Sequence, residues 1–231
     1  MTFPGLWGFM AWDAFHWMSE MMVVYPSLLP KWRLFVSSLI ATLPCIACKY
    51  HAVIHITTHS LSDVKSGQQA VNYAFQFHNS VNAKLGKPQW KSGTYKQKYL
   101  AYRKRNSEVS ARALCRYLFM IAQSLPNRLD LNSTLIDVIH KGWDAILSTF
   151  EKQYLSNRKV LPRPSTETRN ELCNYVLRLR VSLKIDREVQ PLEEYQRLFT
   201  NMYFTTEKLK ITMRHLEYMQ SSSAKQYLPM Y

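Results

Sequence analysis

Apolar and aromatic positions in the first ninety residues recur at the spacing of one helix face. Residues 7–24 place such side chains three or four apart, namely Trp7, Met10, Ala11, Phe15, Met18 and Met22. This predicts a helix that ends at Tyr25-Pro26. The same spacing predicts a second helix over 31–43. Pro44 cannot continue a regular helix and suits the start of the next one.

Two further helices are predicted over residues 45–57 and 67–85. Gly86 and Pro88 end the second of these, since glycine closes helices and proline cannot extend them. Four helices with short connections form a small bundle. The alternative is a strand over 53–57, because β-branched residues crowd that segment.

Longer and more charged amphipathic segments follow Trp90. They predict helices over 107–124, 133–155, 166–183 and 191–219, with prolines between them. The predicted fold class is therefore all-α, with a bundle domain over 1–95 and a helical extension over 96–231. The extension carries no chemical motif, and it fits a degenerate second bundle, a dimerisation layer or a docking platform.

Composition narrows the class of protein. The 231 residues are 47% hydrophobic with four cysteines, which is enough apolar material for a core without a disulfide framework. The apolar N-terminus lacks a basic region and contains Asp13, His16 and Glu20, unlike a signal peptide. The apolar stretch 34–48 is too short for a bilayer. We therefore expect a soluble protein that works inside a cell.

The formal net charge of +14 raises the question of a polyanionic partner. The only dense basic cluster lies between Lys96 and Arg105 (KQKYLAYRKR). Two interpretations stay open, a solvated helix face or a weak polyanion contact. No recognised nucleic-acid motif accompanies the cluster.

The sequence Cys45-Ile-Ala-Cys48 is a candidate redox disulfide or half of a zinc site. At a helix start, unpaired backbone N–H groups lower the pKa of a cysteine, and Lys49 and His51 add polar neighbours. His51, His55 and His59 recur every four residues and could complete a zinc site. Cys115 and Cys173 stand alone in the sequence, so we expect no metal.

The predicted fourth helix carries a polar stripe. His78 and Asn82 are four residues apart and share a face, with Val81 and Leu85 as apolar neighbours. Lys84 and Lys87 follow. Such a helix offers hydrogen bonds to a heteroaromatic ring and cations to a pyrophosphate, as a bound dinucleotide requires.

Four motifs carry a resemblance to a known family. Residues 77–88 (FHNSVNAKLGKP) resemble the H-N-x-V-N-x-x-L-G-K-P signature of the Erv/ALR sulfhydryl oxidases, which are FAD-dependent enzymes that make disulfides. Upstream, the sequence is similar to that family's W-G-x-x-x-W-x-x-x-H opening, to its Y-P and to its P-C-x-x-C-x-x-H; the matching residues are Trp7, Gly8, Trp12, His16, Tyr25, Pro26, Pro44, Cys45, Cys48 and His51. The resemblance covers residues 5–90, and its details look closest to members from large DNA viruses.

The resemblance implies a FAD-binding four-helix bundle and a role for each matching residue. Trp12 and His16 would flank the adenine, with Gly8 and Tyr25 nearby. Lys84 and Lys87 would meet the phosphates. The flavin ring and ribityl chain would be lined by His78, Asn79, Val81 and Asn82, beside Leu85, with Trp90 in place of the usual phenylalanine. His51 would contact the flavin or orient Cys48. Without the motif context, Trp12, Tyr25 and Trp90 fit plain core packing as well.

The implied reaction is 2 R–SH + O2 → R–S–S–R + H2O2. A substrate thiolate attacks Cys45, while Cys48 lies against the flavin, which passes electrons to oxygen. The chain departs from the family in two ways: no second cysteine pair precedes the bundle, so substrates would reach Cys45 directly, and no cysteine follows Gly86-Lys87-Pro88. Cys115 and Cys173 fit buried free cysteines better than resolving thiols.

The expected partners are protein dithiols, molecular oxygen and a second copy of the chain in a homodimer. The expected location is the cytoplasm or nucleus of an infected host cell, or the virion. The alternative function is that of a basic virion structural or nucleic-acid-binding protein with a vestigial oxidase bundle.

Overall fold

The computed structural model describes residues 4–43, 45–104, 108–124, 133–153 and 169–183, and every regular element in these ranges is helical. The first four helices are α1 (Pro4–Val24), α2 (Leu29–Thr42), α3 (Ile46–Thr58) and α4 (Gly67–Lys84). Short 3-10 turns, η1 (Pro26–Leu28) and η2 (Leu61–Asp63), connect them. The all-α prediction and the four predicted helices are confirmed. The alternative of a strand over 53–57 is wrong, because these residues lie inside α3.

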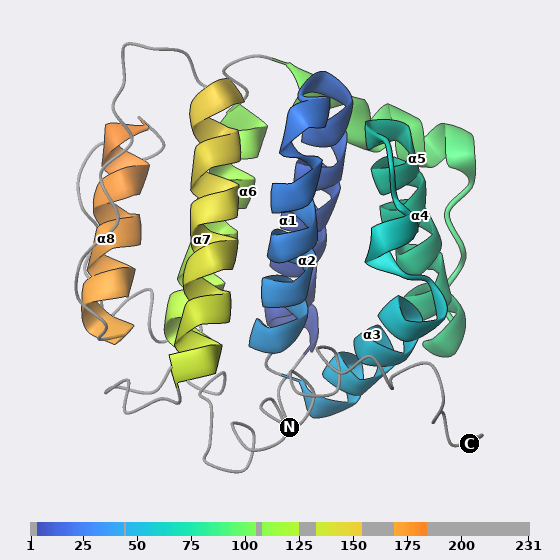
Figure 1. The fold of residues 1–231 in the computed structure, drawn as a ribbon, viewed down its shortest axis with the longest axis horizontal. Coiled ribbons are helices and arrows are strands. Elements are labelled where there is room, and N and C mark those ends of the chain that lie inside the picture. The colour runs from blue at the N-terminus through green and yellow to red at the C-terminus, as the bar shows by residue number, and fades with distance from the viewer. Residues whose placement is uncertain (1–3, 44, 105–107, 125–132, 154–168, 184–231) are drawn as a thin grey trace.

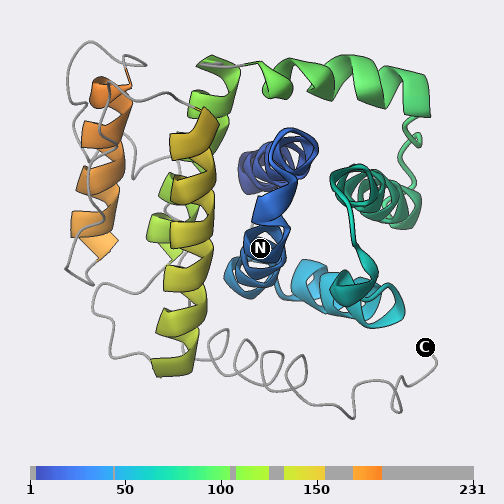
Figure 2. The same ribbon diagram turned by 45° about the horizontal axis from the view of Figure 1, so that its top comes forward.

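Helix α1 is the centre of the packing (Figure 1). It contacts α2, α4, α6 and α7, and Phe15, Trp17 and Met18 have no exposed surface. Figure 2 shows α1, α2 and α4 close to end-on, with α3 seen more from the side next to them. The apolar periodicity of α1 therefore reflects a helix surrounded on most sides.

Local sequence sets the ends of α4. The Ser66 hydroxyl accepts a hydrogen bond from the Gln69 backbone N–H and caps the first turn. Gly86 takes a φ of 64°, and the Lys87 N–H bonds the Asn82 carbonyl at 2.8 Å. Together with the bond from the Gly86 N–H to Ala83, this forms a Schellman motif. The turn brings the Lys87-Pro88 segment back against the end of α4.

A fifth helix, α5 (Ser92–Tyr99), and the 3-10 turn η3 (Leu100–Arg103) cross the bundle beside α1. Helix α5 is not among the helices predicted from the sequence. Helix α5 buries Tyr95 and Tyr99, and η3 buries Tyr102, while Arg103 of η3 forms an ion pair with Glu20 of α1. The cluster between Lys96 and Arg105 is thus not a wholly solvated face. Lys96, Lys98 and Lys104 are exposed, and Arg105 lies outside the described residues.

Three helices follow, α6 (Glu108–Ser124), α7 (Ser133–Gln153) and α8 (Arg169–Ser182). They confirm the helices predicted over 107–124, 133–155 and 166–183; the one predicted over 191–219 lies outside the described residues. Helix α7 packs along α2, α6 packs on α1, and α8 packs on α6 (Figure 1). No described helix is long and apolar enough to cross a membrane.

The division into domains stays a prediction. The predicted boundary between 95 and 96 falls within α5, which packs on α1 through Tyr95 and Tyr99. Helices α6 and α7 contact the same bundle, and a Cβ on Gly142 of α7 would overlap the Ser38 side chain of α2. The described helices after residue 95 therefore lie directly on the predicted bundle domain.

Candidate functional site

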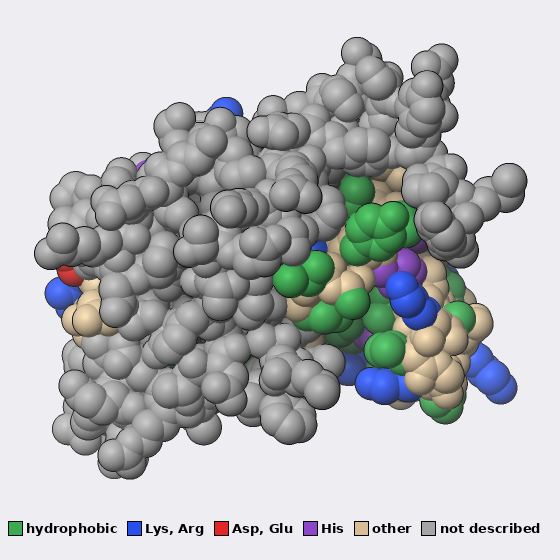
Figure 3. Space-filling view, turned by 90° about the horizontal axis from the view of Figure 1, so that it is seen from below, with side chains coloured by type: hydrophobic (Ala, Val, Ile, Leu, Met, Phe, Trp, Pro, Cys, Tyr) green, Lys and Arg blue, Asp and Glu red, His purple; other side chains and the backbone are tan. Residues whose placement is uncertain are grey.

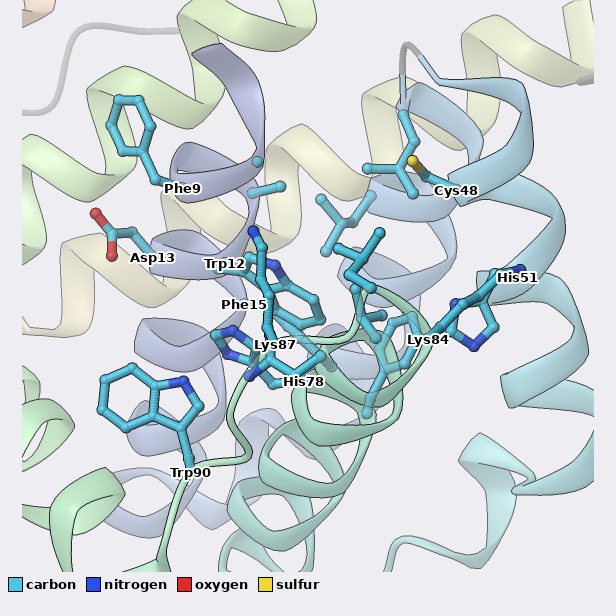
Figure 4. A pocket seen from close by; sticks show the side chains of 18 of the residues that line it. Phe9, Trp12, Asp13, Phe15, Cys48, His51, His78, Lys84, Lys87 and Trp90 are labelled. Carbon is cyan, nitrogen blue, oxygen red and sulfur yellow. The ribbon is translucent and has the colours of Figure 1, made fainter. Parts of the chain in front are cut away.

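A cavity of about 460 Å³ lies between α1, α2, α3, α4 and α5, and the segment that leads into α5 also lines it. This volume falls in the range of small-molecule and cofactor sites. Figure 4 shows α1 side chains, among them Trp12, on one side and Cys48 and His51 of α3 on the other, with His78, Lys84 and Lys87 between them. The cavity thus joins the two motifs on which the sequence analysis depends.

Most of the predicted cofactor residues line this cavity. They are Gly8, Trp12, His51, His78, Val81, Asn82, Lys84, Leu85, Lys87 and Trp90, together with the predicted catalytic Cys48.

Three predicted cofactor residues do not line the cavity. His16 lies behind its wall and is fully buried. Tyr25 lies at the other end of α1, where its hydroxyl donates to the Lys152 carbonyl of α7. Asn79 binds the backbone of Trp90. Its amide donates to the Trp90 carbonyl, and its Oδ1 accepts from the Trp90 N–H at 2.8 Å. Asn79 therefore fixes the segment that carries Trp90.

The aromatic wall is built around a stacked pair. The Trp12 and His78 rings lie 4.1 Å apart between centroids and are inclined by only 3°. At this separation the rings are in contact, so a third ring does not fit between them. Phe77 meets Trp12 edge-on, and the centroid of Trp90 lies 6.1 Å from that of His78. The pair thus forms a stacked aromatic surface at the cavity.

The cavity also carries three lysines and one carboxylate. Lys84, Lys87 and Lys98 line it together with Asp13. The Lys98 ammonium lies 4.7 Å from the Trp90 ring centroid and 5.0 Å from that of Tyr99, within cation–π range. Burial raises the pKa of Asp13, although Lys98 and Arg116 act against this rise. The lysines make this part of the cavity suited to an anion.

Two cysteines form a disulfide at the edge of the cavity. Cys45 and Cys48 are bonded with a Cα–Cα distance of 5.2 Å, and Cys45 is the N-cap of α3. The Cys45 Sγ accepts a hydrogen bond from the Cys48 N–H at 3.2 Å. Cys48 lines the cavity, whereas Cys45 lies outside the lining, next to the exposed Ile46. The two sulfurs therefore face different surroundings.

The face seen in Figure 3 shows described hydrophobic side chains gathered around a hollow, with histidine and lysine or arginine side chains beside them. Phe9 and Leu85 are exposed apolar residues that line the cavity, and Ile46 and Tyr50 are exposed on α3. Apolar side chains are therefore exposed both at the cavity and on the helix that carries Cys48.

Histidines near the cavity are held in the neutral form. Burial lowers the pKa of His78 to about 4, and the nearby Lys98 and Lys87 add to this effect. Burial also lowers the pKa of His16 well below its usual range, and that of His51, where Lys84 contributes. Lys49, predicted as a polar neighbour of the disulfide, is buried.

The described residues do not form the zinc site that was the alternative for the CxxC motif. Among the described residues, no group of three or more His, Cys, Asp or Glu side chains is arranged to hold a metal ion. His55 stacks between His59 and Phe77, with centroid distances of 4.5 and 4.4 Å. Cys115 and Cys173 are buried and belong to no disulfide, as expected.

The sequence analysis missed several lining residues, including Phe9, Asp13, Phe15, Lys98 and Tyr99. Lys98 and Tyr99 belong to α5. A signal for this helix was present, because Tyr95, Tyr99 and Tyr102 are spaced four and three apart and so share a helix face. Because lysines and arginines lie between these tyrosines, the segment was interpreted as a basic cluster and not as a helix with a buried face.

The lining residues fit a flavin dinucleotide. Trp12, His78 and Trp90 provide aromatic surface for a planar ring system, and three lysines provide cations for a pyrophosphate. Cys48 brings one disulfide sulfur to the same cavity.

This helical bundle places a CxxC disulfide at the edge of a cavity lined by aromatic rings and lysines. That arrangement is typical of a dithiol redox protein with a cofactor site. The profile of the Erv1 / Alr family matches residues 10–100. Together with the viral relatives described next, this match shows that the chain belongs to the Erv1 / Alr family.

Three viral relatives show the extent of the similarity. The putative FAD-linked sulfhydryl oxidase 096R of Invertebrate iridescent virus 3 is 36% identical over 99 residues, which are 42% of this chain and 67% of the relative. The putative FAD-linked sulfhydryl oxidase 347L of Invertebrate iridescent virus 6 is 32% identical over 93 residues, 37% of this chain and 84% of the relative. An African swine fever virus FAD-linked sulfhydryl oxidase is 28% identical over 99 residues, 40% of this chain and 79% of the relative. No solved structure matches the chain.

Proposed function

We propose that this protein is a FAD-linked sulfhydryl oxidase that forms disulfide bonds in protein dithiols, 2 R–SH + O2 → R–S–S–R + H2O2. The observation that carries the proposal is the position of the Cys45–Cys48 disulfide, with Cys48 on the wall of a cavity that offers both aromatic surface and lysines. The names of the viral relatives supply the cofactor and the reaction class.

The thiol steps follow from the surroundings of the two sulfurs. A substrate thiolate attacks the Cys45 Sγ, the S–S bond breaks, and Cys48 leaves as a thiolate. This thiolate lies in the first turn of α3, where free N–H groups and the helix dipole stabilise negative charge. A second substrate thiolate then attacks the substrate sulfur of the mixed disulfide and releases the oxidised substrate and a reduced Cys45.

Bound in this cavity, FAD would supply the acceptor for the electron pair of the reduced cysteines and the route to oxygen. The chain would hold it through Trp12, His78 and Trp90 at the aromatic surface and through Lys84, Lys87 and Lys98 near the phosphates. Trp90 is held in turn by its two hydrogen bonds with Asn79.

Oxygen uptake by the purified full-length chain with dithiothreitol tests the proposal. We expect uptake with one peroxide released per disulfide formed, and we expect Cys45→Ser to lower turnover at least about 100-fold while the protein keeps its bound flavin. Cys115→Ala is the matched control, because Cys115 is a cysteine far along the chain and outside the cavity lining. A protein without flavin, or a Cys45→Ser variant as active as the Cys115→Ala control, would contradict the proposal.

Two finer expectations belong to this proposal, a homodimer and action inside an infected host cell. Helices α6 and α7 already pack on α1 and α2, so a second copy would have to use other surfaces of the bundle. Sedimentation of the full-length chain, with a mass of 27.2 kDa expected for a monomer, tests the dimer directly.

A further inference from the structure

Three buried side chains form a row of hydrogen bonds behind the cavity. The Tyr95 hydroxyl of α5 lies 2.7 Å from His16 Nδ1 of α1, and His16 Nε2 lies 2.7 Å from His78 Nδ1 of α4. The exposed fractions are 2%, 0% and 9% along this row. Only the last member, His78, lines the cavity. The row of hydrogen bonds therefore connects Tyr95 of α5 to the cavity.

The hydrogen-bond direction at the Tyr95 hydroxyl determines which ring nitrogens of His16 and His78 carry a hydrogen. Among the described residues, the Tyr95 hydroxyl has one hydrogen-bond partner, His16 Nδ1. A buried O–H without an acceptor is costly, so the hydroxyl donates to that nitrogen. Neutral His16 then carries its hydrogen on Nε2 and donates it to His78 Nδ1.

The same step applies to His78. Because its Nδ1 accepts, neutral His78 must carry its hydrogen on Nε2. This nitrogen has no hydrogen-bond partner among the described residues, and the ring lines the cavity (Figure 4). Stacking against Trp12 fixes the plane of the ring.

We propose that Tyr95 and His16 are positioning residues that hold His78 in its Nε2–H tautomer, so that His78 presents a fixed, neutral hydrogen-bond donor to the cavity. The identity of the acceptor, an oxygen or nitrogen atom of the bound flavin dinucleotide, rests on the proposed function, whereas the tautomer does not. The neighbouring lysines supply charge, and His78 supplies a donor of fixed direction. The desolvation that keeps both imidazoles neutral supports this arrangement.

If all the hydrogen bonds in the row ran in the opposite direction, His78 would present an acceptor to the cavity and not a donor. If His78 Nδ1–H donated to His16 Nε2, then His16 Nδ1–H would have to donate to the Tyr95 oxygen, and the phenol hydrogen would lose its acceptor. His78 would then present a bare Nε2 acceptor to the cavity. The two arrangements differ in one measurable property, the tautomer of His78.

Nitrogen NMR of the full-length, cofactor-loaded protein with 15N-labelled histidine measures that tautomer. We expect His78 in the wild-type protein to show a protonated Nε2 and an unprotonated Nδ1, with the same pattern for His16. In Tyr95→Phe, His16 loses its donor, and we expect both rings to shift from one tautomer to a mixture.

The matched control is Tyr73→Phe. Tyr73 is also a buried phenol that lies against a histidine ring, but its hydroxyl donates to the His59 carbonyl and not to the row. The Tyr73→Phe variant should leave the His78 tautomer unchanged, which separates loss of the row from general loosening of the core.

Three outcomes would overturn the inference: His78 protonated on Nδ1 in the wild type, tautomers in Tyr95→Phe that match the wild type, or an equal shift in the Tyr73 control. The wild-type spectrum alone decides the first of these, so the inference stays open to refutation even if Tyr95→Phe does not fold. Oxygen uptake with dithiothreitol is measured separately, so a failure of the oxidase proposal and a failure of the tautomer proposal are distinguishable.

Discussion

At the scale of single residues, burial controls the charge of the histidines around the cavity. Burial is the largest cause of the lowered pKa at His16, His51, His55 and His78, and charges from neighbours are secondary. His55 lies outside the cavity lining and packs on Phe77 and Tyr73. A substitution of His55 therefore tests the effect of burial on a histidine pKa without changing the cavity lining.

The lowered pKa of His55 predicts a pH dependence of stability. Its pKa falls from 6.5 to about 4 on folding, so the unfolded chain binds more protons between these values. The contribution of the neutral ring is full above pH 6.5 and is lost as pH falls toward 4, by about 3 kcal/mol in total. Asp13 and Glu20, whose pKa values are raised, act in the opposite direction.

The variant His55→Phe isolates this effect, because it keeps an aromatic ring against Phe77 and removes the titrating group. Urea unfolding at several pH values between 7.5 and 4.5 should show a shallower loss of stability in the variant than in the wild type. Equal slopes in the two proteins would refute the assignment.

Residue patterns in the sequence were sufficient for much of the site. The CxxC and the polar stripe of α4 led to Cys48, His78, Asn82, Lys84 and Lys87, because helix spacing fixes which side chains share a face. The roles of His16 and Asn79 were not accessible in this way. Their hydrogen-bond partners, Tyr95 and the Trp90 backbone, lie on segments whose placement depends on tertiary packing.

At the scale of elements, the close approach of α1 and α4 positions the aromatic wall. A Cβ on Gly67 would overlap the backbone at Met22 and Val23, so the first turn of α4 lies directly against the end of α1. This contact aligns His78 of α4 with Trp12 and His16 of α1. Gly93 in α5 is a helical glycine with nothing near its Cβ position.

We predict that Gly67→Ala lowers the free energy of unfolding by about 2 kcal/mol, because two backbones must move apart. Gly93→Ala should be neutral or stabilise the protein by up to about 1 kcal/mol, as alanine favours helices. Chemical denaturation of both variants measures the difference. The account of α1 and α4 packing would fail if the two substitutions had the same effect.

Helices α1 to α4 were predicted from periodicity and from proline and glycine positions, whereas the tyrosine spacing in α5 is hidden among lysines. Proline and glycine punctuation marks the ends of α1 to α4 clearly. The buried face of α5 and η3 consists of tyrosines between basic residues. This segment resembles a charged surface until α1 supplies His16 as a partner for Tyr95 and Glu20 as a partner for Arg103.

At the scale of the whole molecule, Gln153 joins the later helices to the bundle. Its side chain is buried and accepts from Trp17 Nε1 at 2.8 Å, while its amide donates to the Tyr102 carbonyl at 2.6 Å and the Lys104 carbonyl at 2.8 Å. One residue of α7 thus bonds to α1 and to the segment after α5. The described helices share one continuous apolar core.

Gln153→Leu tests whether these parts unfold together. The substitution leaves the buried Trp17 N–H without its acceptor and removes the donor to the Tyr102 and Lys104 carbonyls, so we expect a loss of about 2–4 kcal/mol. The loss should appear in a single unfolding transition followed both by tryptophan fluorescence and by helical circular dichroism. Two separate transitions would instead support an independent C-terminal unit.

The most direct test of the central claim is anaerobic mixing of the purified full-length protein with dithiothreitol, followed through the visible absorbance of its flavin. The account predicts that the flavin bands bleach in the wild type and persist in Cys48→Ser, because Cys48 is the sulfur on the cavity wall. Equal bleaching in the two proteins, or a wild-type protein with no flavin bands, would contradict it.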